Sequence, residues 1–335
     1  MEDIKLNSNN EAFDLVNVDD LNLPEEELFA RIDNSKVTSE KITAPRYSYW
    51  KSVMRVFFKK KINIVLLVML AILIIFAFIY SLSAGFDRFE HVSDTSAKTL
   101  SAGEAIGKYG FSLKWIFGTG NQGQSVFNEL WESTRVSLSI SLNCAVINLT
   151  IGVVLGAVWG YSKKFDVFMT EVYNIIGNVP YVLLISVVVL VVGAGFWPFV
   201  FALTVTGWIA IAYFIRTQVL IIRDREYNLA SRCLGTPILR ITMKNILPFM
   251  TSIIVTLAAT EIPSYISYEV FLSYIGFGLD EASLGKMIEV GQTFMSTSGK
   301  EFLFWIPVIV ASFTTIVLYV IGQNLGDASD PRTHM

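Results

Sequence analysis

Residues 62–82 read INIVLLVMLAILIIFAFIYSL, and this uncharged run decides the class of fold. A helix needs about 20 apolar residues to cross the hydrocarbon core of a bilayer, and the run has that length. It follows a basic stretch and does not stand at the N-terminus, which is typical of a membrane helix and not of a secretion signal. The sequence therefore predicts a fold built in lipid.

Five further apolar regions follow, and together they predict an all-α membrane protein with six transmembrane helices. The expected spans are residues 62–82, 137–160, 173–193, 197–215, 249–268 and 302–321. Composition agrees, because 53% of the 335 residues are hydrophobic and 16% are charged, whereas soluble domains carry about 25% charged residues. In the second span, Gly152 and Gly156 are spaced for the close approach of another helix, which we expect to belong to this chain.

Basic residues gather on alternate connections between these spans. They stand before the first span, between the second and third, and between the fourth and fifth: Lys51, Arg55, Lys59, Lys60, Lys61, Lys163, Lys164, Arg216, Arg223, Arg225, Arg232, Arg240 and Lys244. Cytoplasmic connections carry an excess of Lys and Arg, so both termini are predicted to lie in the cytoplasm. Residues 83–136 then form a long extracellular loop, whose mixed charge predicts that it folds.

The segments before the first span and after the last differ in composition. Residues 1–46 are acidic and polar and predict a mobile cytoplasmic tail. Residues 47–61 place apolar side chains at helical spacing with basic residues between them, a pattern typical of a helix that lies on the inner leaflet. Residues 322–335 form the predicted C-terminal cytoplasmic tail.

No residue pattern in the sequence indicates catalysis, a cofactor or a resident metal. The sequence of residues 118–125, GTGNQGQS, is close to the motif of a phosphate-binding loop, but Gln124 stands where that motif requires lysine. Two cysteines are too few for a disulfide framework, and the two histidines stand in separate segments, so we expect no histidine-based metal site. A net charge of -3 does not suggest nucleic acid as a partner. Any energy input is expected from an ion gradient or from another subunit.

The segment with the strongest functional signal is residues 223–248, RDREYNLASRCLGTPILRITMKNILP. It is too polar to span a membrane and too apolar for a slack linker. Its apolar residues at helical spacing predict a first short helix that ends at Gly235, and Thr236 and Pro237 predict the N-cap and first turn of a second. Such a pair of helices could seat in a groove on a cytosolic partner or could simply connect two spans. The residues alone favour neither.

This segment resembles the EAA loop of ABC-importer permeases, which in that family contacts the ATPase. The pattern Glu-Ala-Ala, three residues and Gly falls on Leu229, Ala230, Ser231 and Gly235, and Ile246, Leu247 and Pro248 close it. Leu229 departs from the glutamate of the generic motif. Glu226 and Tyr227, one helical turn earlier, match the Glu-Tyr of peptide permeases, so the likeness to that subfamily is better.

The resemblance extends along nearly the whole chain. Four further stretches carry it: FGT at 117–119 with Arg135, Ser137 and Leu138 after it, NVP at 178–180, EVFLSYIGFGL at 269–279, and GQNLGDASDPR at 322–332. The sequence is identified as a member of the oligopeptide-importer permeases of the OppC or AmiD type, and its wording is most similar to the streptococcal and lactococcal members.

The resemblance implies a type I ABC-importer permease fold with its core at 137–330, in the bacterial plasma membrane. It also implies partners: a second homologous permease (OppB-like or AmiC-like), two cytoplasmic ATPases (OppD-like and OppF-like), an extracellular peptide-binding lipoprotein, membrane lipid and a peptide substrate. The partner subunits would hydrolyse ATP, so this chain is not expected to be an enzyme. The residues expected to couple it to the ATPases are Glu226, Tyr227, Leu229, Ala230, Ser231, Gly235, Thr236, Pro237 and Arg240.

Two acidic residues in or near the fifth span are candidates for the translocation path. Glu261 lies near the middle of the span, where it either lines the path and meets a peptide's amino group or hydrogen-bonds a neighbouring helix. Glu269 belongs to a stretch shared with the family and is expected to be more structural than ligand-binding.

Several rival functions stay open on sequence alone. A related dipeptide or nickel importer would share the permease pattern. An ion-gradient transporter would need broken helices, an inverted repeat and buried charges, and the sequence offers one acid at depth and no evident repeat. A membrane scaffold or sensor would leave the pattern at 223–248 without a purpose. Whether uptake needs ATP separates the first class from the others.

Overall fold

The computed structural model describes residues 49–84 and 99–330. The predicted tail 1–46, residues 85–98 of the predicted outer loop and residues 331–335 lie outside these ranges. Within them every regular element is helical, and extended pairing is limited to one isolated bridge between Thr119 and Ser125. The predicted all-α class is confirmed.

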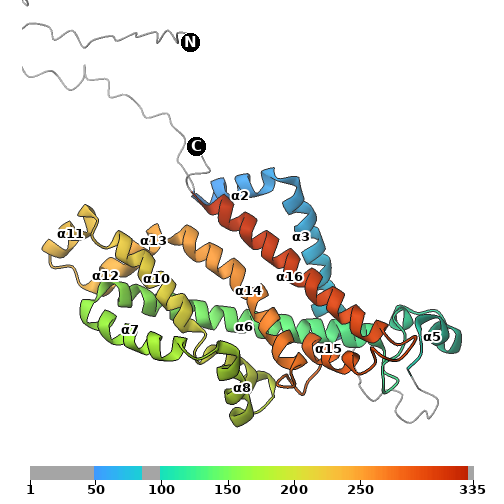
Figure 1. Cartoon of the computed structure of the whole chain (residues 1–335). Helices are drawn as coiled ribbons and strands as arrows, with labels where there is room; N and C mark the ends of the chain where they lie inside the picture. Colours follow the sequence, from blue (N-terminus) through green and yellow to red (C-terminus); the bar gives the residue numbers. More distant parts are fainter. Residues whose placement is uncertain (1–48, 85–98, 331–335) are drawn as a thin grey trace, which may run out of the picture. The chain divides into compact units, whose positions relative to one another are not determined.

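The helices differ greatly in length and follow one another along the chain as labelled in Figure 1. They are α2 (Tyr49–Lys59), α3 (Lys61–Ile74), η2 (Ile75–Tyr80), α4 (Ser81–Ala84), α5 (Ala102–Tyr109), η3 (Leu113–Trp115), α6 (Val126–Tyr161), α7 (Lys163–Gly177), α8 (Tyr181–Val192), α9 (Phe196–Thr204), α10 (Trp208–Ile222), α11 (Glu226–Cys233), α12 (Ile238–Ile241), η4 (Thr242–Ile246), α13 (Leu247–Phe249), α14 (Thr251–Tyr274), α15 (Leu284–Gln292) and α16 (Phe302–Ser329).

Four helical stretches of the described chain are long and apolar enough to cross a membrane. They are Lys61–Ser83, Val126–Tyr161, Phe196–Ile222 and Phe302–Ser329. Two bent pairs raise the number to six when each pair counts as one span: α7 with α8, bent by 82°, and Ile238–Phe249 with α14, bent by 75°. Six is the number that the apolar runs predict.

The predicted span 173–193 is not one straight helix. α7 ends at Gly177, α8 begins at Tyr181, and the chain turns between them at Pro180. Proline has no N–H to continue a helix and restricts the residue before it, which explains the break. Since α8 has 12 residues, it is shorter than the roughly 20 that a straight span needs.

Other helices extend beyond the apolar runs that predict them. α6 begins at Val126, where the Ser125 hydroxyl oxygen accepts the N–H of Asn128 at 3.2 Å, well before the expected start at residue 137. α10 continues to Ile222 and α16 to Ser329, past the expected ends at 215 and 321. Hydropathy marks the apolar part of a helix, whereas capping groups and the following turn decide where it ends.

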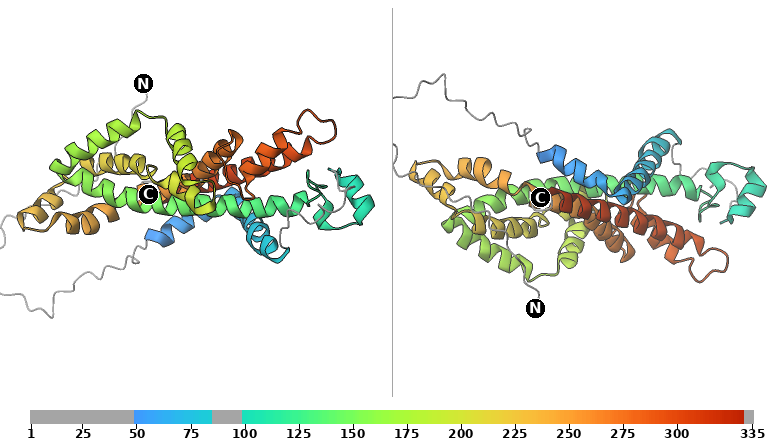
Figure 2. Two further views of the ribbon diagram at one scale, coloured as in Figure 1. Left: turned by 90° about the horizontal axis from the view of Figure 1, so that it is seen from below. Right: turned by 90° about the horizontal axis from the view of Figure 1, so that it is seen from above.

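Three glycines of α6 let its backbone approach α10. A Cβ at Gly156 would stand 2.4 Å from the carbonyl oxygen of Ala212, and one at Gly152 would stand 2.7 Å from the Cβ of Ile211. Gly160 faces Val219 in the same way. The helix that packs on the expected pair of glycines is therefore α10 of the same chain, which lies along α6 in both views of Figure 2.

α2 packs along the C-terminal part of α16. Val53 and Phe57 are buried there, and the Tyr49 hydroxyl donates a hydrogen bond to the carbonyl oxygen of Ser329 at 2.8 Å. A neighbouring face of α2 exposes three large apolar side chains, Trp50, Met54 and Phe58. Such a face suits a membrane surface, and the placement of this helix on the inner leaflet stays a prediction.

Replacing Gly156 by alanine should destabilise the protein, because the added Cβ would overlap the Ala212 carbonyl oxygen and force α6 away from α10. We expect a loss of about 1–3 kcal/mol, measured by unfolding in detergent. Gly107→Ala in α5 is the matched control, since a Cβ there meets no atom within 4 Å and should leave stability unchanged or raise it. Equal stability of the two variants would contradict this view of the contact.

Candidate functional site

The segment 223–248 forms short helices at one end of α6, and α5 lies at the other end (Figure 1). α11 carries the acidic Glu226 in its first turn and the basic Arg232 in its last. Both charges have the sign that the helix dipole favours at their ends. The sequence therefore supports this helix locally, although it has only eight residues.

The turn after α11 is fixed by two backbone hydrogen bonds. The N–H of Gly235 donates to the carbonyl oxygen of Arg232 at 2.9 Å, and the N–H of Thr236 donates to that of Ser231 at 3.1 Å. This is the pairing of a Schellman motif, which needs a left-handed residue at its turn. Gly235 has a φ of +76°, so glycine is the residue that fits without strain.

The second helix starts one residue later than the sequence predicts. Pro237 stands before the first turn of α12, in the place expected for Thr236, and has no side chain that could cap it. Thr236 belongs to the Schellman turn that ends α11, so the residue after it, Pro237, is the N-cap of α12. The predicted roles of these two residues as N-cap and first-turn proline are wrong by one position.

Two asparagines that sequence reasoning missed hold α11 in place. Asn228 is fully buried, and its Nδ2 donates to the carbonyl oxygen of Ile222 at the end of α10, at 3.0 Å. The Nδ2 of Asn245 donates to Asn228 Oδ1 and to Ser231 Oγ, both at 3.3 Å. The one sequence feature that could have indicated a buried role for Asn228 is its position between Tyr227 and Leu229 on a short helix.

The outer face of α11 and α12 carries most of the predicted coupling residues. Exposed among them are Glu226, Tyr227, Leu229, Ala230, Gly235, Pro237 and Arg240, whereas Ser231 and Thr236 are half-buried. Cys233 is also exposed. Apolar side chains are prominent on this face, since Leu234 is 86% and Leu239 59% exposed. We call α11, α12 and the turn between them the coupling segment. Hydrogen bonds fix its inner side, and apolar side chains are exposed on its outer side, a feature that is common in protein–protein interfaces.

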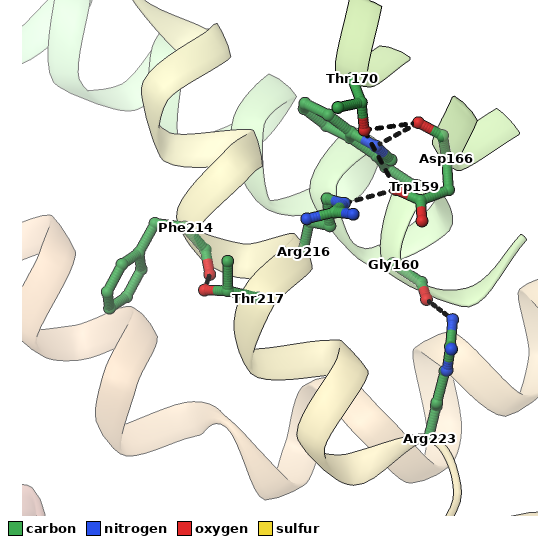
Figure 3. Close-up of polar contacts among 8 residues, drawn as sticks. All are labelled: Trp159, Gly160, Asp166, Thr170, Phe214, Arg216, Thr217 and Arg223. Carbon is green, nitrogen blue, oxygen red and sulfur yellow. Dashed lines mark hydrogen bonds and ion pairs between the residues drawn. The ribbon is translucent and has the colours of Figure 1, made fainter. Parts of the chain in front are cut away.

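Behind the coupling segment, a polar cluster joins α10 to α7 and α6 (Figure 3). Arg216 of α10 forms an ion pair with Asp166 of α7, and its guanidinium carbon lies 5.6 Å from the ring centre of Trp159 on α6. The indole N–H of Trp159 and the hydroxyl of Thr170 both donate to the Asp166 carbonyl oxygen, at 3.2 and 2.7 Å. Side chains from three helices therefore meet around the acidic Asp166 and the basic Arg216.

A second anchor holds the end of α10. The Nη1 of Arg223 donates to the carbonyl oxygen of Gly160 on α6 at 2.9 Å, directly before the coupling segment begins (Figure 3). Sequence reasoning assigned Arg216 and Arg223 only to the count of basic residues. Their partners are 50 and 63 positions away along the chain, so no local pattern could identify them.

Glu269 is fully enclosed by protein groups. The hydroxyls of Ser137 and Ser273 donate to its two carboxylate oxygens at 2.9 and 3.1 Å, and the oxygen of Ser137 accepts the N–H of Leu284 at 3.0 Å. The carboxylate thus joins α6, α14 and the start of α15. Such contacts agree with the expected structural role, and this arrangement gives no support to Glu269 as part of the translocation path.

Glu261 lies elsewhere on α14, at a cavity of about 380 Å³. The break between α7 and α8, the start of α10 and the middle of α14 contribute to its wall. Of the two acids proposed for the translocation path, Glu261 is the one that reaches a cavity. In the described residues, no group of three or more His, Cys, Asp or Glu side chains is placed to hold a metal ion.

The fold is that of a multi-span helical membrane protein, and its coupling segment exposes apolar side chains. Residues 151–335 match the family described as binding-protein-dependent transport system inner membrane component, and residues 48–98 match the N-terminal transmembrane domain of oligopeptide transport permease C. The chain belongs to this family of inner-membrane transport components. It is a permease subunit of the bacterial plasma membrane, which confirms the resemblance seen in its motifs.

Individual relatives cover most of the chain. It is 45% identical to the oligopeptide transport system permease protein AmiD of Streptococcus pneumoniae, over 92% of this chain and 98% of the relative. It is 32% identical to the oligopeptide permease OppC of Bacillus subtilis, over 88% and 93%. It is 35% identical to the dipeptide permease DppC of the same organism, over 64% and 68%.

Asp166 and Arg216 should stabilise the protein as a pair. Either Asp166→Asn or Arg216→Gln leaves a partly buried charge without its partner, so the double variant should lose less stability than the sum of the two single losses. We expect a coupling free energy of about 1–3 kcal/mol from a double-mutant cycle of unfolding in detergent. Additive losses would show that the two side chains act separately.

Proposed function

We propose that this chain is one permease of an ATP-driven oligopeptide importer and forms half of its translocation path. The cargo is supported by the oligopeptide permeases to which it is similar along nearly its whole length. The observation that carries the coupling role is the coupling segment, whose inner side is fastened to α10 and whose outer side is apolar and exposed.

Four partners complete the proposed transporter. A second, homologous permease (OppB-like or AmiC-like) closes the path, and two ATPases (OppD-like and OppF-like) bind and hydrolyse ATP. An extracellular lipoprotein delivers the peptide. Since hydrolysis belongs to the ATPases, this chain is not itself an enzyme. The apolar side chains of the coupling segment provide contact area for such a partner, and the nearby Arg232 and Arg240 add positive charge.

The proposed orientation places the coupling segment and both termini in the cytoplasm. The basic residues 223, 225, 232, 240 and 244 on the connection from α10 to α14 support it, because Lys and Arg are enriched on that side of bacterial membranes. α5 and the loop around it then face outward, toward the lipoprotein. The N-terminal tail 1–46, the surface helix 47–61 and the tail 322–335 face inward in this arrangement.

The proposed cycle is alternating access. When ATP brings the two ATPases together, they displace the coupling segment, and α10 moves with it because Asn228, Arg223 and Arg216 fasten the two helices and their neighbours. The spans then open outward, receive the peptide and return when ATP is hydrolysed. Rigid fastening is what lets a displacement at the surface reach the middle of the membrane.

The assignment is tested by uptake into proteoliposomes that contain the complete transporter. A radiolabelled peptide of three to five residues should accumulate with ATP inside and the lipoprotein outside, and an ion gradient should not replace ATP. Uptake that follows the gradient alone would replace this proposal with a secondary transporter. Preference for a labelled dipeptide would favour the dipeptide importer, which the likeness to the dipeptide permease supports.

Gly235→Trp should uncouple ATP hydrolysis from uptake. The indole would stand on the exposed face beside α11, where the ATPase must approach, so peptide uptake should fall about tenfold or more while hydrolysis continues. Gly299→Trp is a matched control, because Gly299 also has a positive φ, of +83°, with no atom near its Cβ position and lies far from the coupling segment in sequence.

A second variant separates bulk from backbone strain. Gly235→Ala has the same unfavourable φ but almost no added volume, so it should keep most of the uptake. Normal uptake by Gly235→Trp, or an equal loss in Gly299→Trp, would remove Gly235 from the coupling surface.

A further inference from the structure

The cavity at Glu261 lies where two helices are interrupted. Pro180, in the break between α7 and α8, and Thr206, in the turn between α9 and α10, both line it, and α14 closes the third side. Irregular backbone at membrane depth is tolerated where it borders a cavity or is covered by protein. The volume of about 380 Å³ lies toward the small end of ligand sites, which range over about 300–1,000 Å³.

Part of the wall of this cavity is aromatic. Tyr181, Tyr265 and Tyr268 line it next to Glu261, with ring centres 5.1 Å apart for Tyr181 and Tyr268 and 6.1 Å apart for Tyr265 and Tyr268. The faces of such rings attract cations, and the attraction grows when water is excluded.

Several polar groups of the wall can accept a hydrogen bond. The Tyr181 hydroxyl already donates to the carbonyl oxygen of Leu203 at 2.8 Å. The Tyr265 hydroxyl accepts from Asn148 Nδ2 at 2.6 Å. Thr206 Oγ1 is buried and has no hydrogen-bond partner. A ligand that brings several N–H donors fits this set.

The charge of the site is not balanced within the described chain. Glu261 is the one acid among the residues that line the cavity, and no Lys or Arg lines it. A carboxylate at this depth without a cationic partner is unfavourable, because the surroundings are of low polarity. A ligand that carries one positive charge would remove the penalty.

We propose that this cavity is a subsite for a primary ammonium group of the transported peptide, held by Glu261 and enclosed by Tyr181, Tyr265 and Tyr268. This rests on the proposed function, because it assumes that peptide passes through this chain. A primary ammonium has three N–H donors and one charge, which match the carboxylate, the unpaired Thr206 oxygen and the aromatic wall.

Direct binding tests the subsite without the lipoprotein, whose own selectivity would otherwise dominate. The purified transporter in lipid nanodiscs is incubated with labelled tri-alanine, and unlabelled tri-alanine, N-acetyl-tri-alanine and N-acetyl-Lys-Ala-Ala compete. We expect N-acetyl-tri-alanine to compete about tenfold less well than tri-alanine or worse. N-acetyl-Lys-Ala-Ala shows whether the ammonium must be the amino terminus or whether a lysine side chain also serves.

Glu261→Gln should abolish the preference, because glutamine keeps the shape of the side chain but loses the charge. Glu261→Asp should restore part of it. Glu171→Gln, an exposed acid on α7 outside the cavity, is the matched control and should keep the preference unchanged.

Three results would overturn the subsite. They are equal competition by tri-alanine and its acetylated form, a preference that survives Glu261→Gln, and no binding of tri-alanine by a transporter that still takes up peptide with ATP. The importer assignment fails separately, when the complete wild-type transporter shows no ATP-dependent uptake. The two failures are therefore distinguishable.

Discussion

The close approach of α6 and α10 is the contact on which the rest of the described structure depends. Lipid is as apolar as a leucine side chain, so helices in a membrane gain little by hiding apolar surface and associate where small residues let backbones meet. Gly152, Gly156 and Gly160 supply that surface along three successive turns. α6 also packs against α14, α9 and α15, so the position of α10 is defined relative to most of the bundle.

α10 is also connected to its neighbours by polar side chains. Polar side chains fasten α10 to α7 and α6 at Arg216 and Arg223, and Asn228 ties α11 to the end of α10. At the other end of α10, Thr206 and the start of the helix border the cavity that contains Glu261. α10 therefore joins the exposed coupling segment to the interior of the bundle, over its 15 residues.

Apolar runs and turn residues predict the class of fold, the number of spans and the turn at Gly235, because each depends on neighbours in the sequence. A proline within an apolar run, such as Pro180, favours a break in the helix, but the angle of the bend depends on packing. The Asp166–Arg216 pair, the Asn228–Asn245 pair and the enclosure of Glu269 could not be predicted. Each joins residues on different helices, and one sequence contains no periodicity that relates them.

The two cysteines differ in a way that has a practical consequence. Cys144 is buried in the bundle, whereas Cys233 is exposed on α11. A maleimide dye or nitroxide added to the folded wild-type chain would therefore attach at α11 and leave Cys144 unreacted. The natural sequence thus provides an attachment site for a spectroscopic label on the segment proposed to contact the ATPase, so its movement can be followed without engineering a cysteine.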